Sequence, residues 1–203
     1  MIITDIIVCK KNKNRVNIYV DGQFAFALFA ETAVRAGLRK DMDVSGLDLS
    51  KIGEEEEKKF AMDAALSLIA YRMRSKKEVL DKLKQKDVAP ETADLTVEKL
   101  EELGYLNDRN YAAAYAEELK DRMGKRGIRQ KLFEKGVDRV IIDETLNSLG
   151  DFSEVIRAQA ERLFRKNGDA DEYKTVQKVI RTLLNRGFEL DEIKTAISGI
   201  AEE

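Results

Sequence analysis

Histidine and tryptophan are absent from the 203 residues of this sequence, and cysteine and proline occur once each, as Cys9 and Pro90. A single cysteine excludes a disulfide within the chain, and the lack of histidine also excludes a Cys/His zinc site. Acid–base and nucleophilic catalysis usually rely on histidine, or on a Cys, Ser or Lys beside a base. Cys9 lies at the end of a predicted strand, where a free cysteine most simply packs as a small apolar residue. We therefore predict that the chain is not an enzyme and has neither a cofactor nor a metal site.

Long hydrophobic runs and phosphate-binding glycine loops are also missing. The apolar stretches are short and interrupted by charge, which favours neither a signal peptide nor a membrane span. No GxxxxGK[ST] or GxGxxG sequence follows a predicted strand. Apolar residues still make up 43% of the chain, which is enough to bury a core. We expect a soluble, cytoplasmic protein without membrane contacts.

The first 52 residues are predicted to form a small β-rich extension. Three segments are rich in β-branched and aromatic residues, which favours strands: residues 2–8, 16–20 and 24–28. Asp21-Gly22 separates two of them and favours a tight type I′ turn, because that turn needs positive φ at both positions. A short helix at 31–36 and a linker at 38–53 are expected to follow.

A repeated unit dominates the rest of the chain. When Leu83, Leu132 and Leu183 are aligned, 49 and 51 residues apart, apolar residues recur four positions before and five positions after each of them. Periods of this length are typical of helical arrays. The residues before the second apolar set are Asp87, Gly136 and Gly187, which tolerate the left-handed conformation of a helix end.

Charge follows the same repeat. Residues 72–86 contain seven Lys or Arg and two acids, residues 122–135 contain six and one, and residues 174–186 contain four and none. Residues 91–103 reverse this pattern, with five acids and one lysine, so the net charge of −2 hides a strong segregation. If equivalent helices lie side by side, Lys76 and Lys77 lie near Lys125 and Arg126. The resulting basic stripe would suit phosphates or an acidic protein groove.

Helix-boundary residues support this division. Ser75 and Glu78 form a capping box, Asn107 and Ser153 are predicted N-caps, and the acids from Glu54 to Glu57 are expected to open the first long helix. The predicted helices are 56–73, 76–86, 91–103, 108–123, 127–135, 139–149, 154–167, 172–186 and 190–200. The predicted fold is mainly α, with three tandem three-helix repeats (53–104, 105–150 and 151–203) in an elongated array after an antiparallel hairpin or meander (1–52).

The basic residues near the starts of the second helices are the candidate contacts to a partner or to nucleic acid. They are Arg72, Arg74, Lys76, Lys77, Lys125, Arg126, Arg129 and Lys131. The aromatic residues at helical spacings are interpreted as core rather than as base-stacking platforms: Tyr71, Tyr105, Tyr111, Tyr115 and Phe133.

Three local motifs resemble those of the bacterial RecX family of regulatory proteins. They are Tyr71-Arg72-Met73-Arg74-Ser75 with Glu78, Leu80 and Leu83; Leu103-Gly104-Tyr105-Leu106-Asn107-Asp108 with Tyr111-Ala112; and Gly127-Ile128-Arg129-Gln130-Lys131-Leu132 with Lys135-Gly136-Val137. The resemblance covers about residues 58–203 and is weakest over the N-terminal strands. Asp87 departs from the glycine of the sister repeats.

The resemblance implies a curved array of three-helix repeats that lies in the groove of the RecA–DNA filament and restrains recombination. It implies the RecA filament as partner, DNA contact directly or through the filament, a monomer, and no catalysis by the chain itself. The residues alone leave two further hypotheses open. One is a helical module that binds DNA without RecA, and the other is a helical scaffold for an unrelated protein.

Overall fold

The computed structural model describes residues 1–10, 13–167 and 172–201. They belong to two compact units. Unit 1 contains residues 1–72 and 79–102, and unit 2 contains residues 73–78 and 103–203. Helix α3 (Lys76–Gln85) therefore gives its first turn to unit 2 and the remainder to unit 1.

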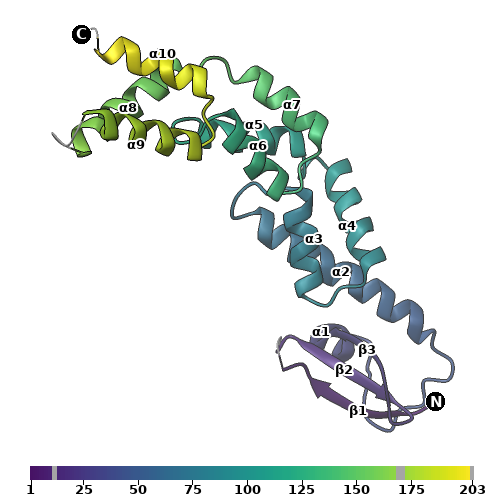
Figure 1. Ribbon diagram of the computed structural model, residues 1–203. Helices are drawn as coiled ribbons and strands as arrows, with labels where there is room; N and C mark the ends of the chain where they lie inside the picture. The colour runs from purple at the N-terminus through teal and green to yellow at the C-terminus, as the bar shows by residue number, and fades with distance from the viewer. Residues whose placement is uncertain (11–12, 168–171, 202–203) are drawn as a thin grey trace. The chain divides into compact units, whose positions relative to one another are not determined.

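Unit 1 begins with a three-stranded antiparallel sheet in the order β1-β2-β3 (Figure 1). Its strands are β1 (Ile3–Val8), β2 (Arg15–Val20) and β3 (Gln23–Phe29), which confirms the predicted strands to within one or two residues. In β2 every second side chain is buried on one face, as expected for a half-covered sheet. The turn between β2 and β3 has φ of 49° at Asp21 and 81° at Gly22, as a tight turn with two left-handed residues requires.

The segment after the short helix α1 (Ala30–Arg35) is not the linker that the sequence predicts. Its backbone pairs with the start of β1 and the residues before it. The N–H of Ile3 donates to the Met42 carbonyl at 2.9 Å, and the N–H of Val44 donates to the Met1 carbonyl at 2.9 Å. Leu38 and Val44 are buried in the core of the sheet. Their apolar side chains hold this segment against the sheet, so it is part of the N-terminal fold.

Helix α2 (Leu49–Ile69) begins seven residues earlier than predicted, with Asp48 as its N-cap. The acids that were expected to open it lie in its second turn and bind other elements. Glu56 is 2% exposed and accepts hydrogen bonds from the Phe29 N–H at 3.3 Å and from Lys59 at 3.1 Å. Glu57 accepts from the Ala89 N–H at 3.1 Å. The acidic run therefore joins α2 to β3 and to Ala89.

The buried Glu56 carboxylate predicts a specific dependence of stability on pH. Burial raises its pKa, but hydrogen bonds from Lys59 and the Phe29 N–H outweigh burial and hold the pKa below its ordinary value. A carboxyl with a depressed folded-state pKa stabilises the fold above its unfolded pKa, and this contribution is lost as the pH falls through the folded pKa. We expect Glu56→Gln to lower the free energy of unfolding at pH 7 by about 1–2 kcal/mol.

The measurement is urea unfolding of wild type, Glu56→Gln and the exposed control Glu55→Gln at several pH values. The deficit of Glu56→Gln should shrink as the pH falls from about 5 to 3, since the wild-type carboxyl becomes protonated. Glu55→Gln should track the wild type. A deficit for Glu56→Gln that stays constant over this range would contradict the ionic role of Glu56.

Three three-helix segments follow, and the chain is mainly helical, as predicted. The other helices are α4 (Pro90–Glu102), α5 (Asp108–Lys120), α6 (Lys125–Glu134), α7 (Arg139–Ser148), α8 (Ser153–Asn167), α9 (Glu172–Asn185) and α10 (Leu190–Ala201). Their bounds agree with the predicted ones to within three residues. The largest difference at a start is in α6, which begins two residues early because Gly124 is its N-cap. The curvature of the array stays a prediction.

The repeat alignment correctly identifies the core. Leu83, Leu132 and Leu183 have no exposed surface. Their equivalents four residues before and five residues after are buried too, namely Val79, Ile128, Val179, Val88, Val137 and Phe188. The predicted left-handed helix ends are confirmed, with φ of 58° at Asp87, 75° at Gly136 and 87° at Gly187.

Two sequence-based interpretations need correction. Asn107 caps α5 as predicted, but Ser153 is the first residue of α8 and its N–H donates to the Asp151 carboxylate. Among the aromatic residues interpreted as core, Tyr71 is 86% exposed, and Tyr105 and Phe133 are exposed as well. Helical spacing places a residue on a face of its own helix, but it does not show that a neighbouring element covers that face.

Candidate partner-binding surface

The first contact between helix ends in unit 2, called joint 1 here, places residues 75–78 at the start of α3 on residues 134–136 at the end of α6. The Ser75 hydroxyl donates to the Lys135 carbonyl at 2.7 Å and accepts the Glu78 N–H at 3.2 Å. Lys77 donates its ammonium to the Glu134 carbonyl at 3.1 Å. Because the last carbonyls of a helix carry a partial negative charge, a cation and a hydroxyl stabilise this end.

Ion pairing completes joint 1. Lys135 reaches back to the Glu78 carboxylate at 2.9 Å, and Arg74 approaches the same carboxylate at 3.5 Å. The backbone N–H of Lys76 donates to Asp108 at the start of α5, at 2.9 Å. The predicted capping box of Ser75 and Glu78 is confirmed, since the Ser75 N–H also donates to Glu78 at 3.3 Å. Ser75 and Glu78 therefore cap the start of α3 and also bind Lys135 at the end of α6.

A second contact of the same kind, joint 2, places residues 124–127 at the start of α6 on residues 184–187 at the end of α9. The Gly124 N–H donates to the Arg186 carbonyl at 3.1 Å, and the Arg126 N–H donates to the Gly187 carbonyl at 3.2 Å. The Arg126 guanidinium donates to the Leu184 carbonyl at 2.9 Å. Backbone groups here perform the function that the Ser75 hydroxyl performs in joint 1.

The joints correct the predicted arrangement of the basic stripe. Ser75 is equivalent to Gly124, and Lys77 to Arg126, but these pairs do not lie side by side. Lys76 and Lys77 lie at the end of α6, whereas Lys125 and Arg126 belong to its start. A helix of ten residues is about 15 Å long. Helix starts thus meet helix ends, because free carbonyls attract the N–H groups and cations of a helix start.

Most of the predicted contact residues have an intramolecular partner. Arg74, Lys76 and Lys77 are described above with joint 1. Arg72 is exposed and lies in unit 1. Lys125 places its ammonium 5.8 Å from the centroid of the Phe152 ring. Arg129 forms an ion pair with Asp143, and Lys131 pairs with Glu134 at 2.9 Å, which raises the pKa of Lys131. Exposed surface pairs of this kind stabilise little and can exchange for a partner.

Sequence reasoning missed two acceptors of joint 1. They are Asp108, which accepts the backbone N–H of Lys76, and Glu134, whose carbonyl accepts the Lys77 ammonium. Neither residue gives a signal in the repeat alignment, because its role depends on which helix end lies opposite. In joint 2, Gly127 and Gly187 do give a signal in the sequence, because glycine is favoured where two backbones approach closely. An added Cβ at Gly187 would lie 2.1 Å from the Gly127 nitrogen.

The described part of the chain shows neither a metal-binding cluster nor a membrane-spanning helix. No group of three or more His, Cys, Asp or Glu residues within 1–10, 13–167 and 172–201 is arranged to hold a metal ion. Over the same residues, no helix is long and apolar enough to cross a membrane. Cys9 directs its thiol to the Asn17 side chain at 2.9 Å.

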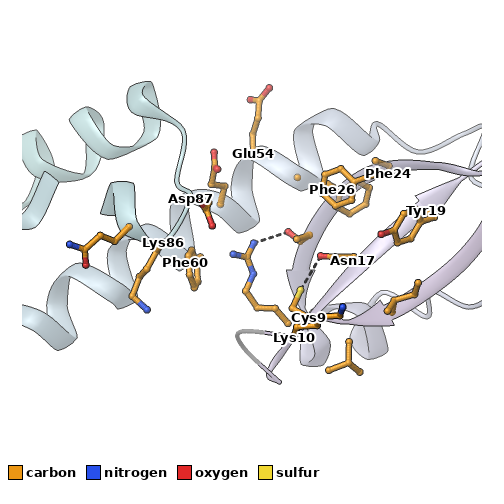
Figure 2. A pocket seen from close by; sticks show the side chains of 18 residues that line it. Cys9, Lys10, Asn17, Tyr19, Phe24, Phe26, Glu54, Phe60, Lys86 and Asp87 are labelled. Carbon is orange, nitrogen blue, oxygen red and sulfur yellow. Dashed lines mark hydrogen bonds between the residues drawn. The ribbon is translucent and has the colours of Figure 1, made fainter. Parts of the chain in front are cut away.

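Unit 1 contains a separate groove of about 1270 Å³, between the open face of the sheet and the end of α3 (Figure 2). Tyr19 and Phe24 line it from the sheet, with their rings edge to face at 6.0 Å. Phe60 of α2 lies deeper, with the Arg15 guanidinium 4.0 Å from its ring centroid. The groove thus combines exposed aromatic surface with a few charged groups.

Comparison with known proteins identifies the family. Four family models match the chain: the regulatory protein RecX N-terminal domain at residues 1–45, and the first, second and third RecX three-helix domains at residues 61–100, 107–146 and 151–197. The match extends to the N-terminal strands, over which the motifs were weakest.

Relatives and solved structures agree with these matches. Regulatory protein RecX of Bacillus subtilis is 34% identical over 99% of this chain and 78% of its own, and that of Clostridium perfringens strain SM101 is 34% identical over 93% and 91%. A crystal structure of regulatory protein RecX has a TM-score of 0.70 and 27% identity, covering 97% of this chain and 98% of that one. RecX from Lactobacillus salivarius has a TM-score of 0.68 and 28% identity, covering 73% and 99%. The chain belongs to the RecX family of regulatory proteins.

Proposed function

We propose that this protein regulates the RecA recombinase, mainly as an inhibitor, by binding in the groove of the RecA–DNA filament. Its membership of the RecX family carries this proposal. The protein would act by occupying the groove, without catalysis of its own. It would thereby modulate recombination and DNA repair in the cytoplasm.

The basic residues of the second helices support the proposal. Arg72 is exposed, and the exposed ion pair of Arg129 with Asp143 is one that a phosphate or an acidic side chain can replace. Contacts at several repeats act together, because each bound repeat raises the effective concentration of the next. A filament offers such repeated sites, and its DNA offers phosphates.

The test is the rate of ATP hydrolysis by RecA on single-stranded DNA, with the protein added after filament assembly. We expect wild type to suppress the rate at substoichiometric amounts, since one bound molecule would affect several filament subunits. The double variant Arg72→Gln/Lys125→Gln should require about five- to tenfold more protein for half-inhibition, since about 1 kcal/mol of binding free energy is about a fivefold change. Arg72 is chosen because it is exposed, and Lys125 because its ammonium contacts the face of an aromatic ring, Phe152.

The matched control is Lys58→Gln/Arg162→Gln, which removes the same charge from two exposed positions outside the candidate set. It should inhibit like the wild type, and circular dichroism should show all three proteins to be folded. If wild type leaves the rate unchanged, the proposal is wrong. Tight DNA binding without RecA, weakening steeply with salt, would then favour the DNA-binding alternative.

A further inference from the structure

Helix α3 ends like α6 and α9, but without a joint. Asp87 has the left-handed φ of 58°, as Gly136 and Gly187 do at the equivalent positions. By the 49-residue offset, the carbonyls of Gln85 and Lys86 correspond to those of Glu134 and Lys135, which accept hydrogen bonds in joint 1. Within the part of the chain that the structure describes, no helix start is found on these two carbonyls.

The end of α3 opens instead into the groove of unit 1. Gln85, Lys86 and Asp87 line the groove, and Phe60 lies beside Lys86, whose ammonium is 5.5 Å from the ring centroid (Figure 2). An α-helix is about 10–12 Å wide and rises about 5.4 Å per turn, so one turn fills roughly 400–600 Å³. The volume of about 1270 Å³ therefore corresponds to about two to three turns of helix.

We propose that this groove receives the first turns of a helix from a partner protein, as the ends of α6 and α9 receive the starts of α3 and α6. The two joints define the chemistry of that helix. It begins with a small or hydroxyl residue, as at Ser75 and Gly124, and carries Lys or Arg two positions later, as at Lys77 and Arg126. The cation and the free N–H groups then bind the carbonyls at the end of α3.

Two further features of the groove refine the expected partner. Lys86 is exposed and stands where Lys135 pairs with the Glu78 carboxylate in joint 1, so an acidic residue three positions after the small one is expected. The half-buried Tyr19 and the exposed Phe24 form an apolar wall on the sheet. A helix with an apolar face beyond its first turn would cover these aromatic rings.

A second copy of this chain fits the groove less well. The start of α9 is the third equivalent helix start, with Thr175, Gln177 and Lys178 at the positions of Ser75, Lys77 and Glu78. Lys178 would oppose Lys86 with the same charge. Helix α9 also begins at Glu172, so Thr175 lies within its first turn, whereas Ser75 precedes its helix. The like charges of Lys178 and Lys86 therefore favour a partner protein over a second copy of the chain.

The test uses a synthetic peptide of residues 73–83 of this chain, held helical by one staple because a free peptide of this length is a marginal helix. It is titrated into the ¹⁵N-labelled full chain. The ends of α6 and α9 are occupied by the chain's own helices. Among the described residues, the end of α3 is therefore the equivalent helix end that the peptide can occupy. We expect amide shifts at residues 85–89 and around Phe60, with Kd between about 10 μM and 1 mM.

A charge exchange then separates the proposed site from general attraction. Lys86→Glu should weaken binding of the peptide at least about fivefold, and the peptide change Glu78→Lys should restore it. Lys84→Glu is the control, since Lys84 is exposed on the same helix but does not line the groove. It should bind the original peptide like the wild type.

Three outcomes would overturn the proposal. The first is the absence of shifts at residues 85–89 up to 1 mM peptide, and the second is equal weakening by Lys86→Glu and Lys84→Glu. The third is dimerisation of the full chain that Lys86→Glu abolishes, because it would assign the groove to a second copy. None of these measurements involves RecA, so they test the groove independently of the proposed function.

Discussion

Replacing Gly187 with alanine is expected to lower the free energy of unfolding by about 2–5 kcal/mol. Two penalties combine at this position. Gly187 has a φ of 87°, where an L-residue with a Cβ costs about 1–2 kcal/mol. The added Cβ would also lie 2.1 Å from the nitrogen and 2.7 Å from the Cα of Gly127. Those atoms are backbone, so joint 2 must separate to make room, and overpacking costs about 1–3 kcal/mol more.

Gly150→Ala is the matched control, because Gly150 has a φ of 63° but no atom within 4 Å of the added Cβ. It should cost only the backbone penalty of about 1–2 kcal/mol. Urea unfolding followed by circular dichroism gives both values. If the two alanine variants are destabilised equally, the close approach of helix ends in joint 2 does not contribute to stability.

Phe188→Ala is expected to destabilise the protein by about 3–5 kcal/mol, as is usual when a buried phenylalanine is truncated. The Phe188 ring has no exposed surface and meets the ring of Phe152 edge to face, with 6.2 Å between the centroids. Because Phe188 directly follows the left-handed Gly187, its ring enters the core of unit 2 immediately beyond α9. Its removal leaves a cavity and deprives Phe152 of this contact.

Phe133→Ala provides the same chemical change in the opposite environment. Phe133 is 53% exposed and faces Arg139, whose guanidinium is 5.9 Å from the ring centroid. A loss below about 1 kcal/mol is expected from such an exposed cation–π contact. Thermal and urea unfolding of the two variants should therefore differ strongly. Similar losses at both positions would contradict the assignment of Phe188 to the core.

Much of the fold could be predicted because its signals are local. The alternation in β2 and the apolar positions around Leu132 reflect which side chains are buried within each element. Asp21-Gly22 and Gly136 predict left-handed backbone, because few other residues adopt it without strain. Ser75 and Glu78 satisfy each other's N–H groups across a single turn, so their capping box can be read from spacing alone.

The parts that could not be predicted depend on contacts between distant residues. The run that contains Glu56 resembles an acidic helix start, and only the position of Phe29 reveals that Glu56 binds a strand. The charge pattern places Lys77 on a basic helix, but not at the end of α6. Periodicity predicts the buried face of each helix. It does not predict which helix start packs on which helix end, because that depends on the direction in which each turn leads the chain into the next repeat.

The two joints differ in how the ionic strength of the solvent should affect them. Joint 1 depends on the ammonium groups of Lys77 and Lys135, and added salt weakens such attractions. Joint 2 has one such cation, the guanidinium of Arg126, beside the backbone amides of Gly124 and Arg126, which carry no net charge to screen. Amide hydrogen exchange should therefore accelerate with salt more at the start of α3 than at the start of α6. Rising salt would then loosen joint 1 before joint 2, in an order set by the chemistry of the helix ends.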